Sequence, residues 1–132
     1  MIAMIKIFKQ FVMVFFIAGI SAQSMADSGN IDADTLMQRL QSSTPPLVID
    51  VRTSAEYDSG HVPGAINIPH YEMGRYIERL AERKGEDIIL YCVSGMRASI
   101  AADLLNQSGF ANLIHLDGDM PGWEKSGKPV EK

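Results

Sequence analysis

Short apolar runs separated by helical patterns constrain the fold of this 132-residue chain more than any other feature. Residues 47–51, 88–91 and 113–116 are rich in branched apolar side chains, as is typical of strands covered on both faces of a sheet. A shorter strand is expected over 65–68, where Pro69 stops it. Strands that alternate with helices predict right-handed crossovers and a parallel sheet, so the expected class is α/β.

The helices between these strands have apolar side chains at three- and four-residue spacing. Asp32 can cap the first helix, Ile31 can pack on Leu36, and residues 42–46 end it. Further helices are expected over 71–84, 98–108 and 119–125, and Gly85 is expected to end the first of these in a left-handed conformation. Residues 27–30 are interpreted as a loose N-terminus.

The first 26 residues have the layout of a secretory signal peptide. Lys6 and Lys9 precede an apolar run over 11–20, and small residues at Ser24 and Ala26 form a cleavage site before Asp27. The alternative is an uncleaved anchor, but this run is shorter than the roughly 20 residues that span a bilayer. We therefore expect residues 1–26 to be removed, residues 27–132 to form one periplasmic domain, and no stable membrane association after cleavage.

Net charge and cysteine content exclude two other classes of protein. The formal charge is -4, and becomes -6 once residues 1–26 are removed, which argues against a nucleic-acid binder. Cys92 is the only cysteine, so an internal disulfide framework is impossible. Its thiol is either a buried packing group or a reactive one.

Cys92 lies where the apolar run 88–91 ends and a helical pattern begins. Ligands of open α/β sheets bind beyond the carboxyl ends of the strands. A tight turn at this point directs backbone N–H groups toward a common centre, and the following helix adds its positive N-terminal end. The residues expected to form this anion cradle are Val93, Ser94, Gly95, Met96 and Arg97, with Gly95 allowing the turn and Arg97 adding a fixed charge. These features favour a thiolate, although local sequence alone leaves the inert buried cysteine open.

Three stretches of the chain resemble the rhodanese family, the thiosulfate sulfurtransferases. They are VIDVRTSAEYDSGHVPGAINIP at 48–69, YCVSGMRAS at 91–99, and DGDMPGWEKSGKPV at 117–130. The resemblance covers about 36–130, which is the core of the expected domain. The third stretch departs from the pattern, because Asp117-Gly118-Asp119 stands where a pair of glycines is more usual.

The resemblance implies a rhodanese-like single domain with a parallel, about five-stranded sheet flanked by helices on both faces. It implies that Cys92 takes sulfur from thiosulfate as a persulfide and passes it to a thiophilic acceptor such as cyanide or a thiol. No metal or other cofactor is required. Phosphatases and arsenate reductases on related scaffolds resemble a Cys-x5-Arg pattern, whereas the spacing here is Cys-x4-Arg, which gives a smaller loop.

The remaining polar residues are expected to support the fold. Asp50 and Arg52 lie at the end of the expected strand 47–51 and are predicted to form a supporting charge pair near Cys92. Glu56 is expected to cap or pair locally, His61 to make a structural hydrogen bond, and Trp123 to pack the last helix. His70 and His115 stand alone, and three scattered histidines do not make a zinc site.

Two functions remain open at this stage. The first is an exported thiosulfate sulfurtransferase, a monomer whose partners are a small anionic sulfur donor and a thiophilic acceptor. The second is a non-catalytic carrier of sulfane sulfur, or a module that binds a redox partner. The presence of both Cys92 and Arg97 favours the enzyme.

Overall fold

A computed structural model describes residues 29–132, so the predicted signal peptide and its cleavage site lie outside the described residues. Five parallel strands form one sheet in the order β1-β5-β4-β2-β3. The strands are β1 (Asn30–Ile31), β2 (Leu47–Asp50), β3 (Ile66–Asn67), β4 (Ile88–Tyr91) and β5 (Leu113–Leu116). The predicted α/β class with a five-stranded parallel sheet is therefore confirmed.

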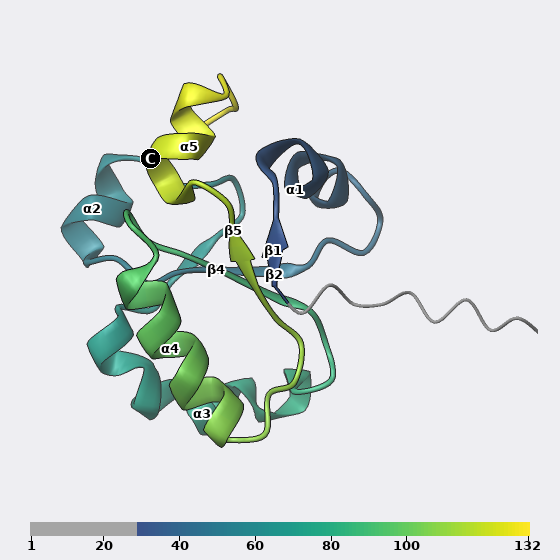
Figure 1. Ribbon diagram of the computed structural model, residues 1–132, viewed down its shortest axis with the longest axis vertical. Helices are drawn as coiled ribbons and strands as arrows, with labels where there is room; N and C mark the ends of the chain where they lie inside the picture. The colour runs from purple at the N-terminus through teal and green to yellow at the C-terminus, as the bar shows by residue number, and fades with distance from the viewer. Residues whose placement is uncertain (1–28) are drawn as a thin grey trace, which may run out of the picture.

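Helices cover both faces of this sheet. Figure 1 shows α1 and α5 on one side of it and α3 and α4 on the other. The α-helices are α1 (Ala33–Leu40), α2 (Ser54–Ser59), α3 (Ile77–Leu80), α4 (Met96–Gln107) and α5 (Asp119–Lys125). Two 3₁₀ segments, η1 (His70–Tyr76) and η2 (Ala81–Arg83), flank α3. Within residues 29–132 no helix has the length and apolar character needed to cross a membrane.

The central strands divide their side chains between two apolar cores, because successive residues of a strand face opposite sides of the sheet. On β4, Ile88 and Leu90 join the core under α3 and α4, whereas Ile89 and Tyr91 join the core under α1 and α5. Cys92 continues this alternation and lies on the α4 side. The side of the sheet on which a group lies therefore decides whether it can contact the sulfur.

The start of α1 follows the sequence prediction. Asp32 caps the helix, and its Oδ1 accepts a hydrogen bond from the backbone N–H of Thr35 at 2.7 Å. Ile31 and Leu36 are both buried in the core under α1 and α5. Asn30 and Ile31, however, form an edge strand that pairs with β5, so the prediction of a loose segment up to residue 30 is wrong at its last residue.

The predicted helix over 71–84 is only partly α-helical. It consists of η1, α3 and η2, and neither α3 nor the 3₁₀ segments have a side-chain cap. Gly74 lies inside η1, where glycine is a poor helix former, and a Cβ at this position would make only an ordinary contact with Leu104 of α4, at 4.0 Å. Gly85 does not adopt a positive φ, so its predicted left-handed cap is wrong.

Candidate active site

Cys92 is fully buried at the end of β4, with 0% of its surface exposed. Its Sγ accepts a hydrogen bond from the backbone N–H of Gly95 at 3.1 Å. Its own backbone N–H donates to Asp119 Oδ1 at 2.9 Å, and its carbonyl accepts from Met120 at 3.1 Å. The sulfur is therefore held in a defined place and receives a backbone donor, which favours a negative charge on it.

The turn that follows Cys92 is shorter than predicted. Helix α4 begins at Met96, two residues before the predicted start at Ala98, so Met96 and Arg97 lie in its first turn. Gly95 precedes the helix with φ +90°, a left-handed conformation that suits glycine. The first backbone N–H groups of a helix have no partners within it and carry partial positive charge, and here they begin next to the sulfur.

Several side chains that follow Cys92 reach solvent. Val93 is 42% exposed and Met96 is 72% exposed, and Ser94 is also exposed. Ser94, Gly95 and Met96 continue into a shallow groove that Ser99, Asp103 and His115 also line. Met96 therefore presents an apolar side chain to solvent in this groove.

Arg97 was expected to bind an anionic substrate, but in the structure it is paired with a carboxylate of the protein. Its Nη1 and Nη2 donate to the two carboxylate oxygens of Glu56 on α2, at 2.7 and 3.1 Å. Hydrogen bonds from Arg97, helped by Thr53 and opposed by burial, lower the pKa of Glu56 to about 2. Glu56 in turn raises the pKa of Arg97, although burial opposes that shift.

Glu56 also completes the start of α2, a helix that the sequence analysis did not predict. The Thr53 side chain accepts from the Glu56 backbone, and the Glu56 carboxylate accepts from the Thr53 backbone, which is a capping box. The T-x-x-E spacing that announces such a box is visible in the sequence. Glu56 therefore caps locally, as expected, but its ion pair is with a residue 41 positions away.

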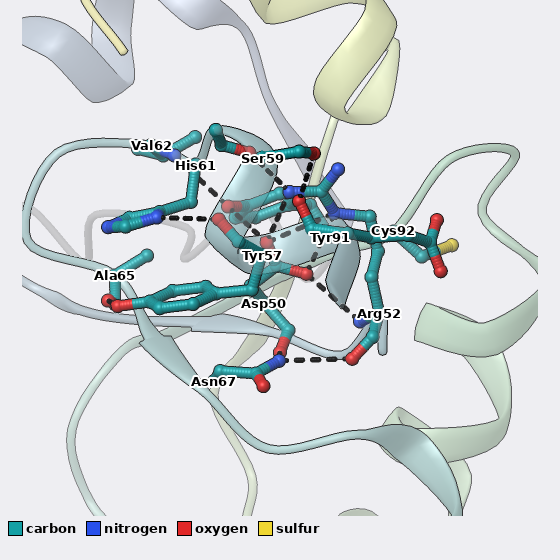
Figure 2. Close-up of polar contacts among 12 residues, drawn as sticks. Asp50, Arg52, Tyr57, Ser59, His61, Val62, Ala65, Asn67, Tyr91 and Cys92 are labelled. Carbon is teal, nitrogen blue, oxygen red and sulfur yellow. Dashed lines mark hydrogen bonds and ion pairs between the residues drawn. The ribbon is translucent and has the colours of Figure 1, made fainter. Parts of the chain in front are cut away.

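Asp50 and Arg52 form the predicted charge pair, and both are buried. Arg52 Nη2 donates to Asp50 Oδ2 at 2.7 Å and to the Gly60 carbonyl at 2.7 Å. The Tyr91 hydroxyl donates to the same Asp50 oxygen at 2.8 Å, as Figure 2 illustrates. Burial and the nearby carboxylate raise the pKa of Tyr91 well above its usual value, so its hydroxyl remains a donor.

This network lies on the other side of the sheet from the sulfur. Asp50 bonds to Tyr91, whose side chain belongs to the core under α1 and α5, whereas Cys92 belongs to the core under α4. The hydrogen bonds of Asp50 and Arg52 within residues 29–132 reach no residue between 92 and 97. The pair therefore supports the end of β4 through Tyr91 and does not contact the candidate site directly.

Two residues that the sequence analysis left aside lie beside Cys92. Asp119 is 3% exposed, and His115 Nε2 contacts its Oδ1 at 2.8 Å, the same oxygen that accepts from the Cys92 backbone. His115 was expected to stand alone, which is wrong. The sequence does contain a sign of this contact. His115 lies near the end of the apolar run 113–116, four residues before Asp119, which stands where a glycine is more usual.

The other residues singled out in the sequence have structural positions. His61 is buried, its Nδ1 lies 2.9 Å from the Tyr57 carbonyl, and its ring stacks on Tyr57. Trp123, a residue of α5, is buried, and its indole N–H donates to the Pro129 carbonyl at 2.8 Å. Neither side chain forms a hydrogen bond with Cys92. Across residues 29–132, no three His, Cys, Asp or Glu side chains are grouped so that they could hold a metal ion.

Comparison with known proteins agrees with this arrangement. The rhodanese-like domain family matches residues 32–126. A sulfurtransferase from Allochromatium vinosum is 32% identical over 100 residues, which is 76% of this chain and 92% of that protein. YrkF of Bacillus subtilis, whose name describes a sulfur carrier, is 28% identical over 78% of this chain, which spans only 55% of YrkF.

A solved structure gives the same result for the fold. The crystal structure of the Alr3790 protein from Anabaena superposes with a TM-score of 0.67 at 31% identity, covering 76% of this chain and 81% of that one. A family model that matches residues 32–126 and a fold neighbour at 31% identity therefore point to the same family. The chain belongs to the rhodanese-like domain family.

Proposed function

We propose that this protein is an exported sulfurtransferase that transfers sulfane sulfur from thiosulfate to a thiophilic acceptor through a persulfide on Cys92. The observation that carries the proposal is the hydrogen bond from the Gly95 backbone to Cys92 Sγ, at the start of α4. A sulfur that receives a backbone donor beside a helix N-terminus is set up to exist as a thiolate nucleophile.

The reaction has two displacement steps. The Cys92 thiolate attacks the outer sulfur of thiosulfate, the new S–S bond forms as the S–SO₃ bond breaks, and sulfite leaves with the electron pair. The acceptor then attacks the outer sulfur of the persulfide, and the Cys92 thiolate is regenerated as the leaving group. With cyanide as acceptor the product is thiocyanate, and no electrons are gained or lost overall.

Because Cys92 is buried, a donor needs a path to its sulfur. The sulfur has no exposed surface, so access of the donor requires a local rearrangement of the turn that follows Cys92. The backbone N–H groups of the turn and the first turn of α4 then hold its negative charge. The smaller Cys-x4-Arg loop suits a single added sulfur atom on Cys92 better than a whole phosphate group.

The second candidate is a carrier that stores sulfane sulfur and passes it once to a partner. Complete burial of Cys92 favours this function, because a buried persulfide is protected from other thiols. The name of YrkF is consistent with the same role. An enzyme and a carrier differ in turnover, since only the enzyme produces many equivalents of product for each protein molecule.

The deciding experiment measures thiocyanate formed from thiosulfate and cyanide by the purified protein and by its Cys92→Ser variant. We expect multiple turnovers in the first and none in the second, since serine cannot form a persulfide. Serine is nearly isosteric and can accept from Gly95, so the fold is retained. Turnover in the serine variant would refute the nucleophile, and a single equivalent of product would indicate the carrier.

Export to the periplasm is proposed on the layout of residues 1–26. N-terminal sequencing of the protein from an expressing bacterium is expected to begin at Asp27. A full-length product in the membrane fraction would contradict export by cleavage.

A further inference from the structure

Asp119 occupies an unusual backbone position with an unusual set of partners. Its φ is +54°, the only positive φ of a non-glycine residue among residues 29–132. Left-handed backbone is unfavourable for most side chains, although Asp tolerates it better than most. The carboxylate in this place is almost completely buried, and one of its oxygens accepts from both the Cys92 backbone and His115.

His115 connects this buried carboxylate to solvent. Its side chain is 33% exposed and lines the groove formed by Gly95, Met96, Ser99 and Asp103. The imidazole lies directly under Gly95, because a Cβ on that glycine would be 3.3 Å from His115 Cε1. Nε2 donates to the carboxylate, so protonation of Nδ1 makes the pair neutral and its loss leaves one negative charge.

The charge of this pair is placed where it can influence the sulfur. Asp119 bonds the amide of the residue that carries the thiol, and His115 lies under the residue whose amide bonds Sγ. The other ionisable side chains around them are Asp103 in the groove and the Arg97–Glu56 pair on the far side of the turn. Asp50, at the end of β2, and Arg52, two residues later, neutralise each other on the opposite face of the sheet.

We propose that His115 and Asp119 form a proton-linked positioning pair for Cys92, in which Asp119 holds the cysteine backbone and the proton on His115 sets the net charge beside the sulfur. This inference rests on the proposed use of Cys92 as a sulfur nucleophile. With His115 protonated, the neutral pair tolerates a thiolate, and with His115 neutral, the Asp119 charge opposes it.

The experiment follows the ionisation of the thiol itself and needs no sulfur donor. Because Cys92 is the only cysteine, a protein labelled with ¹³C at cysteine Cβ gives one resonance whose shift reports the thiolate-to-thiol ratio as a function of pH. The protein is compared with Asp119→Asn, His115→Gln and, as matched control, Asp117→Asn, which removes an exposed carboxylate from the same turn.

Asp119→Asn is expected to raise the thiolate-to-thiol ratio roughly tenfold, as expected for loss of a nearby unit charge in a partly buried site. His115→Gln is expected to lower the ratio at acidic pH by a similar factor, roughly tenfold, and to abolish the change in ratio that accompanies deprotonation of His115. If Asp119→Asn does not fold, Asp119→Gly replaces it in the test, because glycine suits the positive φ and also removes the carboxylate. The same rise in the ratio is expected.

If the thiolate-to-thiol ratio of Asp119→Asn or Asp119→Gly equals that of Asp117→Asn, the proposed positioning pair is wrong. A purely structural role would change the stability of the protein and leave the ionisation of the thiol unaffected. The proposed sulfurtransferase function fails by a different readout, the absence of thiocyanate. If the protein has no turnover but its thiolate-to-thiol ratio responds to these substitutions as expected, the positioning pair stands and the sulfurtransferase function does not.

Discussion

Arg97 on α4 and Glu56 on α2 are joined by two hydrogen bonds, of 2.7 and 3.1 Å, between a guanidinium and a carboxylate. Arg97 is the cation of the segment that follows Cys92, yet two of its five N–H donors already bond to Glu56. An incoming dianion must therefore compete with Glu56 for Arg97, or bind to the backbone N–H groups of the turn.

The first prediction concerns this competition. Glu56→Gln keeps the capping interaction with Thr53, since glutamine also completes a capping box, but removes the charge that holds Arg97. We expect KM for thiosulfate to fall, and Arg97→Ala to raise it by about tenfold to a hundredfold, the equivalent of one charge-assisted contact of about 1.5–3 kcal/mol. Steady-state kinetics at fixed ionic strength measures both.

Asp58→Asn is the matched control, because it removes an exposed charge from the same helix without touching Arg97. An unchanged KM in Arg97→Ala would mean that the backbone N–H groups alone bind the donor. A KM that falls equally in Asp58→Asn would attribute the effect to the general charge of α2.

The second prediction is a pH dependence of stability. Because its hydrogen bonds with Arg97 lower the pKa of Glu56 from a usual 4.5 to about 2, the folded protein binds fewer protons than the unfolded chain between these values. The contribution of Glu56 is present above about pH 4.5 and is lost as pH falls through about 2. The Glu56 side chain is 35% exposed, so screening limits the contribution to about 1 kcal/mol or less.

Urea unfolding of the protein and of Glu56→Gln, at neutral pH and in acid, tests this directly. The difference between the two free energies of unfolding is expected to shrink in acid. A difference that stays constant with pH would show that the pair stabilises only through its hydrogen-bond geometry.

Sequence reasoning identified the sheet, because buried strands such as 88–91 carry an unbroken apolar pattern. It missed the short edge strand at Asn30–Ile31, since two residues carry no periodicity and their pairing with β5 is a long-range contact. It also missed α2, although the capping box was visible, because the helix has no apolar face to reveal it.

The location of Cys92 and its following turn agrees with the strand-to-helix pattern of the sequence, whereas the contacts around them could not be predicted. Cys92 and Gly95 could be read from the turn between a strand and a helix. The partners of Arg97 and Cys92 could not, because Glu56 and Asp119 are 41 and 27 positions away from them. Only the fold determines which distant carboxylate meets which donor.

The third prediction concerns the buried network behind Cys92. Asp50→Ala leaves the Arg52 charge buried without its partner, and is expected to cost about 3–5 kcal/mol in the free energy of unfolding. Tyr91→Phe removes the donor to Asp50 and the acceptor of the Val62 backbone, at a cost of about 1–3 kcal/mol. Tyr71→Phe is the control, because Tyr71 is 67% exposed and its change is expected to be nearly neutral.

The last prediction tests the turn at Gly95 by substitution with alanine. Gly95 has φ +90°, and an added Cβ would lie 3.3 Å from His115 Cε1 and 3.6 Å from Asp119 Oδ2. Gly64→Ala is the matched control, since φ there is +77° but an added Cβ meets nothing within 4 Å. Both substitutions introduce a left-handed alanine, at about 1–2 kcal/mol, but only Gly95→Ala also displaces the imidazole. We therefore expect the two variants to lose similar amounts of stability, as measured by urea unfolding. A large loss of sulfur transfer is expected in Gly95→Ala alone. Equal activity in the two variants would show that the close approach of Gly95 and His115 is not needed.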